Sequence, residues 1–409
     1  MKALAIAAIA AASFITPAVA GQMDFDTVSA GRYQAILGDC QACHTRPGGK
    51  PFAGGAPLET PFGKLVPPNI TPDPTTGIGN WTEADFQRMM KKGVGHRGVR
   101  LYPAMPYPAY SKMPDKDIAD LWAYMRTVQP VVNEVKSNQL PFPFNIRAVM
   151  IGWNWINFDG APFKPDPNKS DLWNRGAYIV NGPGHCGTCH TPKTFMGADK
   201  QKLALTGASL QGWFAPNITG DKRIGIGGWS DEELSAYLKT GRNSYGRASG
   251  PMAEAIEAST SKMTDADIKA IVTYLKDSAA SSGSATAPQP ASADDPHMKA
   301  GAAIYAVSCS ACHGSDGKGE KNMFPSLAGN PAVMQSGTET LARVVLAGTQ
   351  AAYTAAAPTS PAMPSFAWRL NDQQTADLLT YIRNSWGNAA APVASGDVSK
   401  ARSLLRDGS

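Results

Sequence analysis

Charged residues are scarce in this 409-residue sequence, where Asp, Glu, Lys and Arg together make up 17% of the chain. An ordinary globular protein has about 25%. The 40 glycines and 32 prolines exceed typical usage, which indicates compact domains with many loops and few long solvated helices. The formal net charge is only +5 and no run of lysine and arginine occurs, so a nucleic-acid ligand is not expected.

Long apolar runs are missing after the N-terminus, and a transmembrane helix, which needs about 18 such residues, is therefore not expected. Residues 1–20 differ from the rest. They contain one lysine, an apolar stretch rich in alanine, and Ala18-Val19-Ala20, which is an A-x-A cleavage pattern. We predict a cleaved secretory signal peptide and an exported mature chain. The alternative, an N-terminal membrane anchor, would need a longer and less alanine-rich run.

No cysteine is left over once a single pattern has been counted. All six lie in three C-x-x-C-H motifs, which are Cys40, Cys43 and His44; Cys186, Cys189 and His190; and Cys309, Cys312 and His313. Structural zinc needs four ligands, and each motif supplies three without a recurring fourth. A thioredoxin-type dithiol needs a βαβ context, which is absent. Haem c uses every position, with two thioethers and a proximal histidine, so we predict three covalently bound haems c.

The motifs lie within an internal repeat. Residues 31–45 align with 176–191, and residues 68–86 align with 216–234, at similar separations. The first two units are thus duplicates. The third unit follows the same plan in a shorter form.

Each unit ends in apolar residues at helical spacing, which predicts closing helices over 115–128, 264–277 and 371–386. Thr264 and Asp267 resemble a capping box at the start of the second. The Gly/Pro/Asn-rich stretches between helices show little strand periodicity. The predicted fold class is all-α, with three cytochrome c-type haem domains in tandem and long Gly/Pro-rich loops.

The repeat also sets the expected domain boundaries. After the signal peptide these are 21–130 for domain 1, 131–170 for a Pro/aromatic connector, 171–278 for domain 2, 279–295 for a flexible linker, 296–388 for domain 3 and 389–409 for a C-terminal tail. The linker is a low-complexity Ala/Ser/Pro segment. In the tail, only residues 398–406 could form a short helix, and we expect a frayed terminus.

Within the connector, residues 144–158 are rich in aromatic and aliphatic side chains. We expect them to pack between the first two domains, since apolar connectors usually pack internally. The alternative is a docking surface for a partner subunit or for the bilayer interface, to which Trp153 and Trp155 would be suited.

An electron-carrying haem also needs a distal ligand, and methionine sulfur raises the potential relative to a second histidine. Packing is the commoner role of any one methionine. Met105 and Met252 follow the histidines of their units at nearly equal spacing, and Met363 lies in a P-x-M-P pattern ahead of its closing helix. These three are the predicted distal ligands. Met113 and Met263 are the alternatives in the first two units.

The remaining histidines share no cluster at metal-ligand spacing, and we expect them to be exposed or to contact a haem propionate. They are His96, His185 and His297. His185, beside Cys186, is the one expected to touch the surroundings of its haem. The tyrosines expected to pack on the haem or on the closing helix are Tyr33, Tyr178 and Tyr305.

With these motifs the chain resembles the triple-haem cytochrome c subunit of bacterial membrane-bound dehydrogenases. That group includes the flavoprotein gluconate, sorbitol and fructose dehydrogenases and the quinoprotein alcohol dehydrogenase. The resemblance covers essentially the whole mature chain. It rests on GDCQACHT, PNITPDPTTGIGNWTEADF, LYPAMPYPAYSKM, GPGHCGTCHTP, FPSLAGNP and RNSWGN.

The resemblance implies an electron-transfer subunit with no catalytic residues of its own. It would carry electrons through three haems c to ubiquinone, from a large catalytic subunit that oxidises gluconate, another sugar or polyol, or an alcohol. It also implies a small third subunit and peripheral attachment at the periplasmic face of the inner membrane. Quinoprotein-linked members usually continue well beyond RNSWGN, so the short tail favours an FAD partner over pyrroloquinoline quinone.

Two other classes of function stay open. A haem enzyme such as a cytochrome c peroxidase would need one iron with an open or displaceable ligand, and a methionine candidate in each unit speaks against it. A free multihaem periplasmic electron shuttle would stay soluble without detergent and would copurify with nothing.

Overall fold

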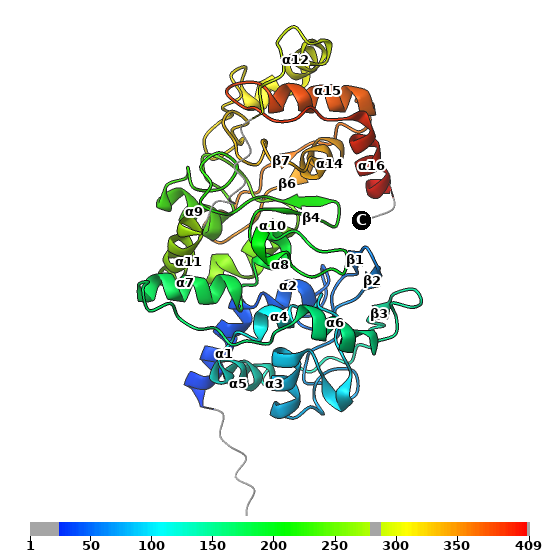
Figure 1. Ribbon diagram of the computed structural model, residues 1–409, viewed down its shortest axis with the longest axis vertical. Coiled ribbons are helices and arrows are strands. Elements are labelled where there is room, and N and C mark those ends of the chain that lie inside the picture. The colour runs from blue at the N-terminus through cyan, green and yellow to red at the C-terminus, as the bar shows by residue number, and fades with distance from the viewer. Residues whose placement is uncertain (1–23, 279–287, 407–409) are drawn as a thin grey trace, which may run out of the picture.

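The computed structural model describes residues 24–278 and 288–406. The predicted signal peptide and residues 279–287 of the predicted linker lie outside the described residues. The molecule is rich in helix, at 42%. Figure 1 shows the N-terminal unit at the bottom of the molecule, the second unit above it and the third at the top. The units are therefore stacked in the order of the sequence.

The first unit is followed by a connector with a helix of its own. The elements of this unit are α1 (Phe25–Leu37), α2 (Cys40–His44), β1 (Leu58–Thr60), β2 (Gly63–Leu65), α3 (Glu83–Lys92), η1 (His96–Gly98), α4 (Tyr107–Tyr110) and α5 (Asp115–Met125). The connector carries β3 (Asn138–Gln139) and α6 (Val149–Asn157).

The second unit repeats this order, and the third shortens it. The second contains α7 (Asp171–Asn181), α8 (Gly187–His190), η2 (Gln201–Leu203), β4 (Ala208–Leu210), β5 (Trp213–Ala215), α9 (Asp231–Thr240), α10 (Pro251–Ala258), η3 (Thr260–Lys262) and α11 (Asp265–Asp277). The third contains α12 (Pro296–Ser308), α13 (Ser310–His313), α14 (Glu339–Ala347), β6 (Thr349–Gln350), β7 (Ala362–Met363), α15 (Asp372–Arg383) and α16 (Ser395–Arg406).

The three predicted closing helices are confirmed as α5, α11 and α15, and each crosses the first helix of its unit at a glycine. A Cβ atom on Gly31 of α1 would lie 1.8 Å from the carbonyl oxygen of Asp120 in α5. Only a residue without a side chain permits so close an approach of two helices. The equivalent pairs are Gly176 with Ala270, at 2.0 Å, and Gly301 with Asp377, at 2.2 Å.

Helix starts follow the repeated sequence blocks. Thr82 and Asp85 form a full capping box at the start of α3, with both reciprocal hydrogen bonds present. The capping box predicted at α11 forms only by half. Thr264 Oγ1 accepts a hydrogen bond from the Asp267 amide at 3.2 Å, whereas the Asp267 carboxylate turns to Arg175 instead.

The prediction of an all-α fold omits seven short strands among the described residues. They form antiparallel sheets in the orders β1-β2-β3, β4-β5 and β6-β7. The first two hairpins are duplicates, with Leu58 opposite Leu65 and Ala208 opposite Ala215. Strands of two or three residues are too short to show an alternating pattern in a sequence, which is why the loops were expected to lack them.

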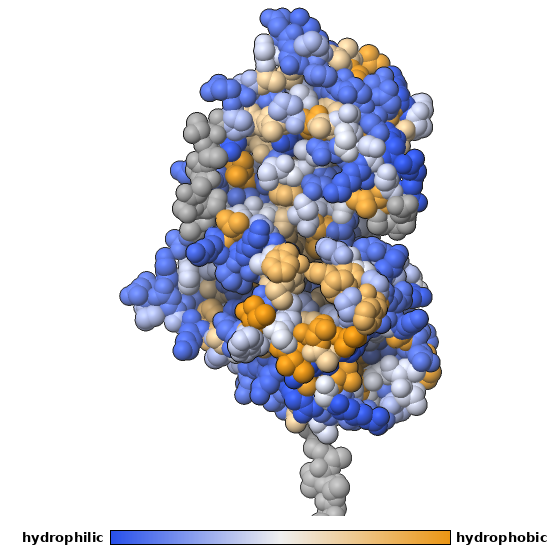
Figure 2. All heavy atoms as spheres, turned by 45° about the vertical axis from the view of Figure 1, so that its right-hand side comes forward, coloured by the Kyte–Doolittle hydropathy of each residue, from blue (hydrophilic) through white to orange (hydrophobic). Residues whose placement is uncertain are grey.

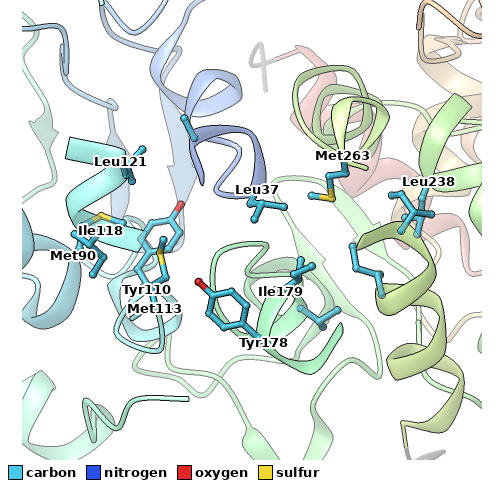
Figure 3. Packing of buried hydrophobic residues seen from close by; sticks show 14 of the residues in the cluster. Leu37, Met90, Tyr110, Met113, Ile118, Leu121, Tyr178, Ile179, Leu238 and Met263 are labelled. Carbon is cyan, nitrogen blue, oxygen red and sulfur yellow. The ribbon is translucent and has the colours of Figure 1, made fainter. Parts of the chain in front are cut away.

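The first two units share one hydrophobic core, and the third has its own. Figure 3 shows Leu37 and Tyr110 of the first unit in the same cluster as Ile179 and Met263 of the second. The third core contains residues from α12 to α16, including Tyr305. The duplicated units are therefore packed as a pair.

One face of the connector helix α6 holds the first two units together, as the sequence predicts. Trp153 is buried, and its Nε1 donates a hydrogen bond to the Met196 carbonyl of the second unit at 2.8 Å. Asn154 Oδ1 accepts a hydrogen bond from the Tyr107 hydroxyl of the first unit at 2.5 Å. Trp155 does not join this packing and is 86% exposed.

The expectation of a frayed C-terminus is wrong for residues 395–406, which form α16. This helix lies against the third unit beside α14 and α15 (Figure 1). Val398 is fully buried there, and Arg402 Nε pairs with Asp372 at 2.7 Å. Within the described ranges, no helix combines the length and apolar character needed to cross a bilayer.

Candidate haem-binding sites

The histidines of the three motifs are held in the same way. His44 Nδ1 lies 2.7 Å from the Pro68 carbonyl oxygen, and His190 Nδ1 lies 2.7 Å from that of Pro216. In the third unit His313 Nδ1 lies 3.1 Å from the carbonyl oxygen of Pro325. Burial lowers the pKa of all three imidazoles, which favours the neutral form. A neutral ring that donates through Nδ1 leaves Nε2 free to bind a metal.

Pro68 and Pro216 belong to the repeated PNIT block, whose role the sequence analysis missed, whereas Pro325 lies in the FPSLAGN run of the third unit. After Pro68, Asn69 Oδ1 accepts hydrogen bonds from the amide and hydroxyl of Thr71, at 2.9 and 2.8 Å. Asn217 and Thr219 repeat this turn in the second unit. The repeat therefore encodes a rigid loop whose proline carbonyl orients the histidine. The similar spacing of this block from the two motif histidines, 24 and 26 residues, is the signal that could have found it.

The cysteines lie on or next to the short helices that follow α1, α7 and α12, and none forms a disulfide among the described residues. Burial raises the pKa of the Cys40 and Cys186 thiols to about 12, so they stay protonated at neutral pH. Two thiols and an imidazole with a free nitrogen are the donor set that haem c attachment uses. The residues present thus fit that group.

All three motifs face a continuous apolar cavity of about 3200 Å³. A single small-molecule site occupies about 300–1,000 Å³, so this space suits three large planar groups. The predicted distal ligands Met105, Met252 and Met363 all line the cavity. Of the alternatives, Met263 lines it as well. Met113 does not, and it is buried in the core of the first two units.

Tyr33 and Tyr178 each form a hydrogen bond to the closing helix of the other unit. Tyr33 Oη donates to Asp267 of α11 in the second unit at 2.7 Å. Tyr178 Oη donates to Asp117 of α5 in the first unit at 2.5 Å. Both tyrosines therefore contact a closing helix, as expected, but it is the closing helix of the neighbouring unit. Tyr305 stays within its own unit, where its hydroxyl donates to the Gly314 carbonyl at 2.7 Å.

The first two cysteine motifs meet at the turn before Cys40. His185 Nε2 lies 3.2 Å from the Gly38 carbonyl oxygen, which also accepts a hydrogen bond from the Tyr110 hydroxyl at 2.8 Å. The rings of Tyr110 and His185 meet edge to face at 5.5 Å. His185 therefore touches the surroundings of the first site as well as its own.

Asp39 lies in the same turn with a positive φ of 49°. Its buried Oδ1 has no hydrogen-bond partner. Burial, with Glu254 as the next contribution, raises the pKa of this carboxyl to about 8. A protonated side chain at neutral pH avoids placing an unpaired charge in the apolar cavity.

The other two histidines bond to carboxylates, which the sequence analysis did not predict. His96 Nδ1 lies 2.9 Å from Asp85, and His297 Nδ1 lies 2.7 Å from Asp377. Each tethers one element of its own unit to another. Neither pair belongs to a cysteine motif.

The third unit contacts the loop that orients His190. Gln335 Oε1 accepts a hydrogen bond from the Asn217 amide at 3.1 Å, and Gln335 Nε2 donates to the Ile224 carbonyl at 2.6 Å. Nearby, the Phe214 amide donates to Thr340 at 2.7 Å. The second site thus lies between the first and the third.

Comparison with known proteins finds the cytochrome c family. The family model for cytochrome c matches residues 28–129, 174–279 and 298–386, so three matched segments fit three haems. The chain is 40% identical to the gluconate 2-dehydrogenase cytochrome c subunit of Pantoea cypripedii, over 92% of this chain and 89% of that protein. It is 41% identical to the fructose dehydrogenase cytochrome subunit of Gluconobacter japonicus, over 92% and 82%. Identity to the alcohol dehydrogenase (quinone) cytochrome c subunit of Gluconacetobacter polyoxogenes is 38%, over 93% and 85%.

Proposed function

Because the chain belongs to the cytochrome c family, we propose that it is the electron-transfer subunit of a dehydrogenase complex at the periplasmic face of the cell membrane. The observation that carries the proposal is the threefold pairing of a motif histidine with a proline carbonyl, facing one cavity. A subunit that relays electrons needs its sites side by side in an interior that excludes water. The stacking of the units and the one continuous apolar cavity that the motifs line support this role.

We assign the residues as follows. The six motif cysteines attach three haems c, and His44, His190 and His313 are the proximal ligands. Met105, Met252 and Met363 are the distal ligands. When bound, each haem supplies an iron that exchanges one electron at a time. The three haem domains are residues 21–130, 171–278 and 296–388, with the helices as the main scaffold.

We propose a large catalytic subunit as the electron donor and ubiquinone as the acceptor, with a small third subunit completing the complex. The donor oxidises gluconate, another sugar or polyol, or an alcohol. Relatives named for gluconate and fructose dehydrogenases support a flavoprotein partner, and the relative named alcohol dehydrogenase (quinone) makes a quinoprotein the competing choice.

The test is to isolate the complex. Native membranes are solubilised in mild detergent, the chain is captured through an affinity tag, and the cofactor of any large copurifying subunit is identified. An untagged strain serves as the control. We expect FAD, and reduction of the visible haem bands when gluconate or another sugar is added. If the cofactor were pyrroloquinoline quinone, the expected substrate would be an alcohol. A chain that came away alone would overturn the proposal in favour of a free shuttle.

A further inference from the structure

The side of α6 turned away from the protein core is apolar and exposed, and three of its residues, Val149, Trp155 and Ile156, also line the cavity that the three motifs face. Met150 and Trp153 are buried against the protein. The opposite face of the helix carries no charged side chain. Its exposed members, with their exposed fractions, are Val149 (47%), Ile151 (55%), Trp155 (86%) and Ile156 (62%). A helix on the surface of a soluble protein normally directs polar residues outward, so this face is expected to be covered.

The apolar surface extends beyond the helix. It continues along the segment before α6, through exposed Phe142, Phe144 and Ile146. The ring of Phe62, in the turn between β1 and β2, meets that of Phe144 at 5.2 Å. Figure 2 shows hydrophobic side chains gathered on the lower half of the molecule, where Figure 1 places α6 and the β1-β2-β3 sheet. We call residues 142–156 with Phe62 the apolar face.

Two segments around the apolar face carry basic side chains and no acidic ones, and the one carboxylate of the β1-β2 hairpin, Glu59, is paired with Lys64 at 2.6 Å. Residues 135–158 contain no Asp or Glu, and neither do residues 86–114. Hydrogen bonds hold the two segments together, from Arg147 Nη1 to the Arg100 carbonyl at 2.8 Å and from the Tyr102 hydroxyl to the Phe144 carbonyl at 2.7 Å. Arg88 and Lys91 pair with carboxylates outside these segments. Among the described residues, no salt bridge involves the other basic side chains here, which are Lys92, Arg97, Arg100, Lys112, Lys136 and Arg147.

We propose that the apolar face docks on a bilayer containing anionic phospholipid, with α6 lying in the plane of the headgroups. The inference rests on the proposed function, which puts the chain at the cell membrane, and it names the surface that makes the contact. An apolar helix face with exposed tryptophan, bordered by lysine and arginine, has the chemistry of an interfacial membrane helix. A protein interface would need about one hydrogen bond per 100–200 Å². The outward face of α6 offers only the Trp155 indole for this.

Docking here places one haem site nearest the bilayer. The Tyr107 amide donates to the Met105 carbonyl at 2.7 Å, and the Tyr107 hydroxyl donates to Asn154 of α6 at 2.5 Å. The helix therefore lies directly behind the loop that presents the distal ligand proposed for the first unit. In this orientation the first unit would face a quinone in the membrane.

The test uses the full haem-loaded chain and vesicles of phosphatidylglycerol and phosphatidylethanolamine. Bound protein is sedimented with the vesicles and measured by haem absorbance. We expect the double variant Trp155→Glu/Ile156→Glu to lower the partition coefficient at least about tenfold. The matched control is Trp368→Glu, because Trp368 is 80% exposed in the third unit, away from the apolar face. The control should bind like the wild type. Added salt, or phosphatidylcholine alone, should weaken wild-type binding.

Several results would overturn the inference. If the double variant bound vesicles as well as the wild type does, the apolar face would not be the membrane contact. The inference would also be rejected if the wild type did not bind vesicles. If the double variant lost the catalytic subunit during purification but still bound vesicles, the apolar face would be the contact for a protein partner. Reduction of a water-soluble quinone by the detergent-solubilised complex tests the proposed function separately. A double variant that keeps this quinone reduction but no longer binds vesicles supports both proposals. If the wild-type complex does not reduce the quinone, only the proposed function is rejected.

Discussion

At the scale of single residues, the distal ligand is the assignment most open to test. In the third unit, Met363 and Met323 are the two methionines that line the cavity among the described residues. We expect Met363→Ala to leave its haem covalently attached and to lower that haem's potential by on the order of 100 mV, because a thioether ligand is lost. A redox titration of the visible bands measures this. Met323→Ala should leave the potential unchanged, and the reverse pattern would make Met323 the ligand.

A second prediction at this scale concerns pH. The hydrogen bond and charge of Asp377 raise the pKa of His297 above its ordinary value. A histidine whose pKa is higher in the folded chain adds stability below its unfolded pKa of about 6.5, and this contribution disappears as pH rises through the folded pKa. The melting temperature of the wild type should therefore exceed that of His297→Gln most at acidic pH. Melting curves between about pH 5.5 and 8.5 test this, and a difference that grows with pH would contradict it.

At the scale of elements, the crossing glycines make a sharp prediction. Gly31→Ala would put a methyl group 1.8 Å from the Asp120 carbonyl oxygen and force α1 away from α5. We expect a loss of about 1–3 kcal/mol in the free energy of unfolding, as for other overpacked contacts. Gly152→Ala in α6 is the control, since a Cβ there has no atom within 4 Å. It should be neutral or slightly stabilising. Denaturant unfolding compares the two, and equal effects would show that the crossing does not need glycine.

The same scale shows what a sequence can and cannot predict here. The closing helices were predictable because the apolar spacing of a helix such as α11 is local and long. The short hairpins were not, because Leu58 and Leu65 belong to strands of three residues each. The site was half predictable. The motif histidines can be recognised from the C-x-x-C-H pattern. The partner of His44 is the backbone carbonyl oxygen of Pro68, and a backbone contact of this kind cannot be recognised from residue types.

At the scale of the whole molecule, the repeat suggests three independent domains, but the first two units pack together as a pair. Alignment of the repeats assigns Tyr33 and Tyr178 to their own units, and nothing in the spacing says that each hydroxyl crosses to the closing helix of the neighbour. The exchange depends on how two finished units fit together. The crossed bonds accompany the core that the first two units share, whereas the third unit has its own core and shares with the second a smaller cluster of Ala248, Ala253, Ile256 and Ala352.

This pairing predicts two unfolding transitions, one for the first two units together and one for the third. Tyr33→Phe/Tyr178→Phe removes both crossed hydrogen bonds to carboxylates, each worth about 1.5–3 kcal/mol, and should lower the midpoint of the first transition alone. Tyr305→Phe removes a bond within the third unit and should lower the other. Calorimetry of the haem-loaded chain separates the two. A single transition, moved equally by both sets of variants, would mean that the contact of Gln335 with the second unit couples all three units into one cooperative body.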